Sequence, residues 1–172
     1  MSVNKSQGNG NCRWTPPPPG VFKVNVDGAT SENGRNSSVG AVIRDSCGGV
    51  TTACCKYFQG NFSVAEVEAL AVETGILLTR DMKISQVIIE SDVATTVSNI
   101  NEKFVDGGLG HLYQRILALL SSFISWKIKH LNREYNKAAH ELAHLARRSE
   151  ASQVWVGVCP LALLEVIQTD CI

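Results

Sequence analysis

Three strand-like segments come before the first helical pattern, and this order limits the fold more than any other feature. Residues 22–27 alternate apolar and polar side chains, which is typical of a strand with one buried face. Residues 39–45 and 50–58 have the composition of two further strands, separated by a short Ser-Cys-Gly-Gly turn. We therefore expect the chain to begin its fold with an antiparallel meander.

Helical and strand patterns alternate in the rest of the chain. Residues 64–80 place apolar side chains on one stripe at helical spacing. The other expected elements are a strand at 86–89, helices at 93–100 and 112–121, a strand at 123–131, a helix at 136–148 and a tail with helical character around 161–167. This order predicts an α/β (mixed α+β) fold with a five-stranded mixed sheet, its first three strands antiparallel, and helices packed on its faces.

The length of 172 residues fits one domain that can bury a proper core. We expect residues 14–172 to form that domain and residues 1–13, rich in Asn, Ser and Gly, to be a disordered lead-in. The segment Trp14-Thr-Pro-Pro-Pro-Pro-Gly20 should be an extended arm, with Trp14 packed against the domain. Because the net charge is zero, a nucleic-acid partner would have to be held by a local patch.

Compartment and redox state follow from what the sequence does not contain. It has no run of membrane-spanning length, and its polar start does not resemble a signal peptide. Its six cysteines show neither C-x-x-C spacing nor a Cys/His zinc pattern, and the adjacent Cys54 and Cys55 would point to opposite faces of a strand. We expect a monomeric intracellular protein, nuclear or cytoplasmic, that is not secreted and has no membrane partner.

Three acids lie at the ends of different expected elements. Asp27 ends the first strand, Glu66 opens the long helix and Asp92 follows the fourth strand. Together with His140 in the last helix, they have the layout of a carboxylate cluster that holds divalent metal for phosphodiester chemistry. Clustered carboxylates repel one another and raise each other's pKa unless a cation joins them.

Each acid also has a purely structural interpretation. Asp27-Gly28 is a turn signal, although the gap to the next strand is too long for a two-residue hairpin. Glu66 completes an S-x-x-E capping box that starts at Ser63. Asp92 is a candidate N-cap for the helix that follows it.

Helical spacing favours Glu66 over Glu68 for the metal site. Glu66 shares a row with Leu70 and Leu77, which we expect to lean toward the sheet. Glu68 shares a row with Val72 on the opposite side. We therefore expect Glu68 to be solvated.

Residues His140-Glu141-Leu142-Ala143-His144 match H-E-x-x-H, the zinc-protease helix motif. A zinc protease needs a third ligand downstream, and no Gly and His follow at the spacing of one such class. The motif also lies too close to the C-terminus for a second half of a substrate cleft. Zinc proteolysis is a minor alternative.

Further motifs occur in order from Trp14 nearly to the C-terminus. They are Trp14, Pro17, Gly20, Lys23, Asn25, Asp27-Gly28-Ala29, Gly40-Ala41-Val42-Ile43-Arg44-Asp45, Ala65-Glu66, Ile89-Glu90-Ser91-Asp92, His130, Arg133-Glu134, Asn136, Ala139-His140, Leu142-Ala143, Trp155, Pro160 and Asp170. In these motifs the chain resembles ribonuclease H type 1, and specifically the plant branch of ribonuclease H-like domains found alone or at the end of non-LTR retroelement (retrotransposon) reverse transcriptases.

The resemblance implies an enzyme that hydrolyses the RNA strand of an RNA–DNA hybrid with two metal ions, Mg²⁺ or Mn²⁺. It implies that the metal-site residues are Asp27, Glu66, Asp92 and His140. It places the loop histidine that helps the product leave at His130. His140 stands where the wider family has an acid, so we expect weaker activity with Mg²⁺ than with Mn²⁺.

Recognition of the hybrid should come from its shallow minor groove and its 2′-hydroxyls, read by residues near Gly28, Asn33 and Asn61. The loop from 100 to 110 contains only Lys103 as a basic residue, which predicts weak and salt-sensitive binding. A fused or associated partner domain could supply the missing affinity.

Two other functions stay open. The first is a catalytically weakened domain that binds nucleic acid or a partner without cutting, favoured by His140 and by Val93, which follows Asp92 where many relatives have a hydroxyl residue. The second is a metal-dependent exonuclease or resolvase of similar fold. Retention of all three acids favours the hybrid nuclease.

Overall fold

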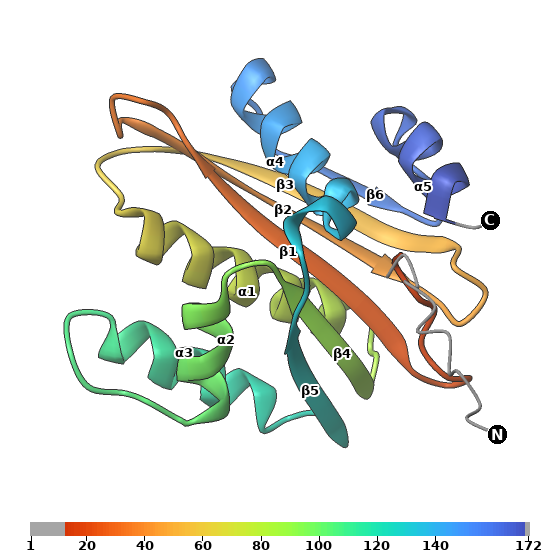
Figure 1. The fold of residues 1–172 in the computed structure, drawn as a ribbon, viewed down its shortest axis with the longest axis horizontal. Helices are drawn as coiled ribbons and strands as arrows, with labels where there is room; N and C mark the ends of the chain where they lie inside the picture. Colours follow the sequence, from red (N-terminus) through yellow and green to blue (C-terminus); the bar gives the residue numbers. More distant parts are fainter. Residues whose placement is uncertain (1–12, 171–172) are drawn as a thin grey trace, which may run out of the picture.

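A computed structural model describes residues 13–170, so the expected disordered lead-in lies outside the described residues except for Arg13. A mixed sheet of six strands runs through the centre of the molecule (Figure 1). The strands are β1 (Phe22–Thr30), β2 (Asn36–Arg44), β3 (Val50–Gln59), β4 (Gln86–Ser91), β5 (Ser125–His130) and β6 (Gln153–Val156), in the spatial order β5-β4-β1-β2-β3-β6.

The α/β class with a mixed sheet is confirmed, but the expected number of five strands is wrong. Strands β1 and β2 are antiparallel, as are β2 and β3, whereas β4 is parallel to β1 and β5 is parallel to β4. The sixth strand, β6, is antiparallel to β3 at the edge of the sheet. Its four residues, Gln153-Val154-Trp155-Val156, do not alternate apolar and polar side chains, so the sequence did not indicate a strand.

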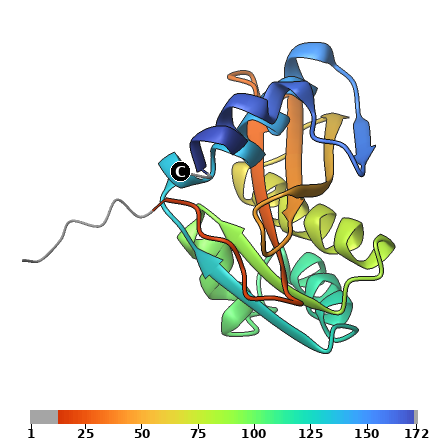
Figure 2. The ribbon, with the colours of Figure 1, turned by 90° about the vertical axis from the view of Figure 1, so that its right-hand side faces the viewer.

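Helices cover both faces of the sheet (Figures 1 and 2). One face carries α1 (Val64–Asp81), with α2 (Ala94–Asn101) and α3 (Gly110–Leu120) beside it. The other face carries α4 (Lys137–Ser149), followed after β6 by α5 (Leu164–Asp170). Two short 3₁₀ helices, η1 (Arg133–Tyr135) and η2 (Leu161–Leu163), precede α4 and α5. Within residues 13–170, none of these helices is long and apolar enough to cross a membrane.

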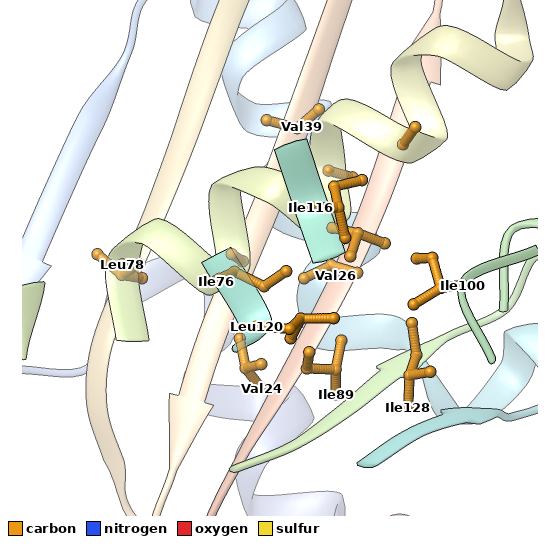
Figure 3. Packing of buried hydrophobic residues seen from close by; sticks show 14 of the residues in the cluster. Val24, Val26, Val39, Ile76, Leu78, Ile89, Ile100, Ile116, Leu120 and Ile128 are labelled. Carbon is orange, nitrogen blue, oxygen red and sulfur yellow. The ribbon is translucent and has the colours of Figure 1, made fainter. Parts of the chain in front are cut away.

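The sheet separates two hydrophobic cores. In the larger core, strand residues such as Val26 and Ile89 face Ile76 of α1 and Leu120 of α3 (Figure 3). The smaller core lies between the sheet and α4 and α5. Cys54 belongs to the larger core and Cys55 to the smaller, which confirms that they point to opposite faces. The four cysteines within the described range are all free thiols.

Glycines let one helix approach the sheet on each face. A Cβ atom at Gly75 of α1 would lie 2.5 Å from Cγ1 of Val26 in β1. On the opposite face, a Cβ atom at Gly40 of β2 would overlap the Ala139 carbonyl oxygen and lie 2.7 Å from Cβ of Leu142. Both helices therefore rest almost directly on the backbone of the central strands.

The N-terminal arm is anchored on the sheet, as expected for Trp14. This side chain is only 6% exposed, and its Nε1 donates a 2.9 Å hydrogen bond to Oδ1 of Asn25. The Arg44 guanidinium stacks 3.6 Å from the centre of the indole ring. The same guanidinium forms a 2.8 Å ion pair with Asp170 of α5, so the arm and the C-terminal helix meet at one buried arginine.

Candidate active site

Two of the predicted acids meet where neighbouring strands diverge. Strands β1 and β4 pair in parallel up to Asn25 and Glu90. Asp27 and Asp92 each lie two residues beyond this last pair. Asp27 belongs to β1, where side chains alternate, so it points to the same side as Asn25; Asp92 directly follows the last residue of β4. A carboxylate oxygen of each acid lies within 4.8 Å of one of the other.

Glu68 of α1 completes the cluster. Asp27, Glu68 and Asp92 each offer a carboxylate oxygen, and these atoms lie within 4.8 Å of one another. Gly28 makes the approach possible, because a Cβ atom there would lie 2.8 Å from Cγ1 of Val67. The start of α1 thus packs directly against the end of β1.

The prediction that Glu66 is the second acid of the site is wrong in the structure. Glu66 instead closes the capping box: its Oε2 accepts a 2.8 Å hydrogen bond from the Ser63 backbone, and its own N–H donates to Ser63 Oγ at 3.1 Å. Among the described residues, Glu66 is not part of a metal-binding group.

The spacing of apolar residues in α1 gave the wrong side for the site because this helix is covered on two sides, by the sheet and by α3. Gly75 packs directly against Val26 of β1, and Glu68 lies two turns before it on the same face. Val72, expected on the opposite side of the helix with Glu68, is fully buried, and so is Thr79 further along the helix. The packing of α3 could not be seen in the periodicity of α1 alone.

The charges of the cluster are strongly coupled. Burial raises the pKa of Glu68 to about 8, and repulsion by Asp27 and Asp92 adds to the increase. Burial also raises the pKa of Asp27 to about 6, with a further increase from Asp92 and an opposing decrease from His140. In the part of the chain that the structure describes, Oε2 of Glu68 is buried without a hydrogen-bond partner.

This donor set fits a divalent cation. All three groups are carboxylates, the ligands that hard cations such as Mg²⁺ and Mn²⁺ prefer. A cation would also offset the burial and the repulsion that raise the pKa values of Glu68 and Asp27, and it would give the unpaired oxygen of Glu68 a partner.

His140 lies beside the cluster as a hydrogen-bond partner. Its Nδ1 is 2.9 Å from Oδ2 of Asp27, and its side chain is 31% exposed. The start of α4 is fixed by the buried Asn136, whose Nδ2 donates a 2.9 Å hydrogen bond to the Val26 carbonyl. Neither ring nitrogen of His140 belongs to the group formed by the three acids within residues 13–170.

The second histidine of the H-E-x-x-H motif lies in the same cavity. The rings of His140 and His144 are 4.2 Å apart, and Arg147 approaches His144 Nδ1 at 3.4 Å. Burial, His140 and Arg147 lower the pKa of His144. The metal-binding group found among the described residues consists of carboxylates and includes neither histidine, which argues against the zinc-protease alternative.

Two further residues border the site near Asp92. His130 at the end of β5 is exposed, with Nε2 3.2 Å from the Asp92 carbonyl oxygen. Arg133 is exposed, with Nε 4.0 Å from the Asp92 carboxylate. Asp92 does not cap the following helix, because the N-cap residue of α2 is Val93 and it makes no side-chain cap bond. The structural alternative for Asp92 is therefore wrong.

The predicted contacts with the hybrid lie in different settings. Gly28 lines the cavity. Asn33 and Asn61 are exposed in the loops after β1 and β3. Oδ1 of Asn33 accepts hydrogen bonds from Ser31 Oγ and the Arg35 backbone, so it stabilises its own turn.

The cavity that holds the acids has a volume of about 430 Å³ and is open to solvent. It lies between the ends of β1 and β4, the start of α1 and one face of α4. It contains the three acids, His140, and basic residues from η1 and α4. An extended anionic polymer can reach a site of this kind from outside.

Comparisons with known proteins identify the family of the chain. Residues 25–146 match the family model described as "Reverse transcriptase-like". The chain is 31% identical over 140 residues to an Arabidopsis thaliana protein named "Putative ribonuclease H protein At1g65750". This match covers 77% of the chain but only 22% of the relative, so the chain spans about a fifth of that protein's length.

Solved structures share the fold. RNase H1 from Halobacterium salinarum superimposes with a TM-score of 0.69 at 22% identity, covering 76% of this chain and 99% of that one. LC11-RNase H1, solved in complex with an RNA/DNA hybrid, has a TM-score of 0.68 at 19% identity, covering 75% and 98%. At these identities the likeness concerns the fold alone. Together with the family match, it shows that the chain belongs to the reverse transcriptase-like family and contains a ribonuclease H-like domain.

Proposed function

We propose that this protein is a metal-dependent endonuclease that hydrolyses the RNA strand of RNA–DNA hybrids. The observation that carries the proposal is the convergence of Asp27, Glu68 and Asp92 in one open cavity. A relative named as a ribonuclease H and a fold shared with a hybrid-bound RNase H1 support the choice of substrate. Because that relative is much longer, we also propose that a fused or associated domain contributes to substrate affinity.

The residues that would hold the metal are Asp27, Glu68 and Asp92, with Mg²⁺ or Mn²⁺ as the ions. When bound, two such ions supply positive charge against the carboxylates and Lewis acidity for in-line hydrolysis of a phosphodiester. The protein contributes fixed positions. Asp27 lies within a strand paired to β2, and Glu68 lies on a helix packed against the sheet.

His140 has a positioning role that does not depend on ligation. Its hydrogen bond fixes the orientation of the Asp27 carboxylate and lowers the pKa of that group. The additional metal-ligand role expected from the sequence stays a prediction. An imidazole ligand should favour Mn²⁺ over Mg²⁺. Equal rates with both ions, unchanged in His140→Ala, would contradict it.

His130 and the hybrid contacts are proposed at the rim of the site. His130 is exposed beside Asp92, where an imidazole can exchange protons with a departing product. Gly28 presents backbone rather than a side chain to the cavity, which suits contact with the sugar edge of a minor groove. Asn33 and Asn61 are proposed as outer contacts. We propose that the protein works as a monomer inside the cell, in the nucleus or the cytoplasm.

A binding-only domain is the less favoured function. Three clustered carboxylates that repel one another, two of them buried, cost folding stability, and binding alone does not require them. Their joint presence favours catalysis.

The test is cleavage of a labelled RNA–DNA hybrid with Mn²⁺ or Mg²⁺, measured beside thermal melting with and without each ion. The intact chain should cut the RNA strand, and the ion should raise the melting temperature by mass action. Asp27→Asn should abolish cleavage and reduce the thermal shift. Ion-dependent stabilisation without cleavage would favour the binding-only domain. The absence of both stabilisation and cleavage would refute a metal site.

A further inference from the structure

The cavity of the three acids has a second end of opposite charge. His144 and Arg147 follow His140 along α4 and line the cavity together with Thr30, near the end of β1. Among the described residues, Arg147 forms no ion pair with a carboxylate. One cavity therefore combines a carboxylate cluster with a guanidinium whose charge is not neutralised.

Arg147 is held in a fixed position. Its Nη1 donates a 2.7 Å hydrogen bond to the Thr30 carbonyl, and its Nη2 lies 3.4 Å from His144 Nδ1. A guanidinium has five N–H donors, so several stay available for a ligand. Two anchors on separate elements reduce the entropy that a flexible arginine would lose on binding.

His144 adds a neutral donor beside this cation. Its Nδ1 is the acceptor for an N–H of Arg147 at 3.4 Å. The hydrogen of a neutral imidazole must then be on Nε2. No hydrogen bond from Nε2 is present in the described part of the chain. The cavity thus offers a cation and an N–H donor side by side, a combination suited to phosphate oxygens.

We propose that His144 and Arg147 form a phosphate subsite for the phosphodiester next to the scissile one on the cleaved strand. The inference rests on the proposed nuclease function: the acidic end would take one phosphate and the basic end its neighbour. The same cavity is lined by Gly28 and the exposed Val64, which present small or apolar surface that can contact a sugar. The subsite would select a polynucleotide over a short phosphate ester, and it gives the second histidine of H-E-x-x-H a role other than zinc binding.

The first experiment measures binding separately from cleavage. The affinity of a fluorescent RNA–DNA hybrid is followed over a range of KCl concentrations, with Asp27→Asn present in every variant to prevent cutting. Arg147→Gln should weaken binding about tenfold and reduce the slope of log affinity against log salt by about one. Arg147→Lys keeps the charge and should keep the slope. Arg148→Gln is the matched control, because Arg148 is the next residue, exposed and outside the cavity.

The second experiment locates the contact. Hybrids carry one neutral methylphosphonate at either phosphate flanking the cleavage position. At one of these two positions, the methylphosphonate should weaken binding to the Asp27→Asn protein about as much as Arg147→Gln does. The same methylphosphonate should cause no further loss of affinity in the Arg147→Gln variant. Additive losses, an Arg147→Gln slope equal to that of Arg148→Gln, or an Arg147→Lys slope as low as that of Arg147→Gln would each overturn the subsite. Absence of hybrid cleavage by the unmodified chain would instead refute the nuclease function. The binding results would still test the subsite, because they do not depend on cleavage.

Discussion

The indole Nε1 of Trp14 donates a hydrogen bond to Oδ1 of Asn25, two residues before the catalytic candidate Asp27. Asn25 in turn donates to Oδ1 of Asn136 at 3.2 Å, and Asn136 donates to the Val26 carbonyl. A buried polar network therefore extends from the proline-rich arm to the start of α4. The helix that presents His140 is fixed by the same contacts that anchor the arm.

The network predicts a specific cost for Trp14→Phe. Phenylalanine keeps a ring beneath Arg44 but leaves the buried Oδ1 of Asn25 without its donor. The free energy of unfolding should fall by about 1–2 kcal/mol. Trp14→Ala also removes the packing and should cost about 3–5 kcal/mol. Urea denaturation measures both, and an unchanged midpoint for Trp14→Phe would show that the hydrogen bond contributes nothing.

The assignment of Glu68 is tested by comparing it with Glu66. Glu68→Gln should lower cleavage by about 100-fold or more, because it removes one of three metal-binding carboxylates. The same change should raise the stability of the metal-free protein, because it removes a buried ionisable group that two other acids repel. Glu66→Gln is the matched control, since glutamine also completes a capping box. It should leave cleavage and stability near those of the parent, and the reverse pattern would restore Glu66 to the site.

Stability without metal should fall as pH rises. Glu68 has a pKa of about 8 in the folded protein against an ordinary 4.5, and Asp27 about 6 against 3.8. The folded state therefore binds more protons than the unfolded state between these values. The stability that these two groups contribute is fully present below their ordinary pKa values and is lost as pH rises through about 6 and then about 8.

Melting in EDTA across this pH range checks the expectation. Glu68→Gln should flatten the upper part of the curve, because the group of higher pKa is gone. Mn²⁺ competes with protons for the carboxylates, so its stabilising effect should grow with pH. A metal-free melting temperature that rises steadily from about pH 5 to about pH 8 would contradict the coupled cluster.

Close contact between α4 and β2 predicts that Gly40→Ala is severe. The new methyl group would meet the backbone of α4 at Ala139 and Ala143, which cannot rotate away. We expect a loss of about 3 kcal/mol or more in unfolding free energy, at the upper end of overpacking costs. Displacement of α4 would also separate His140 from Asp27 and lower cleavage in the protein that still folds. Gly108→Ala, with no atom within 4 Å of the new carbon, should change neither property.

Most of the fold was predictable because its signals are local. Alternation along residues 22–27 and helical spacing along 64–80 each correspond to an element of the structure. The strand at Gln153–Val156 was not predictable, because its four residues become a strand only by pairing with β3. What makes this segment a strand is its pairing with β3, which is far away in the sequence.

The site shows the same division. Asp27 and Asp92 were identifiable because each stands at the end of an alternating or apolar strand pattern, although β1 continues beyond Asp27 to Thr30. The choice between Glu66 and Glu68 depended on which side of α1 faces the sheet. Because α3 buries a second side of this helix, apolar residues alone could not identify the side that faces the sheet. Asn136 was noticed only as part of a resemblance. Its role became visible once Val26 was placed beside it.

Because Asn25 and Glu90 are paired in the parallel register, the position of each acid depends on the number of residues that separates it from this pair. One residue inserted in either strand ahead of Asp27 or Asp92 would turn the acid to the opposite face of the sheet. Insertions in the loop between β1 and β2 leave that count unchanged. Natural or engineered length changes should therefore accumulate in such loops, while these two strands admit changes of residue but not of number.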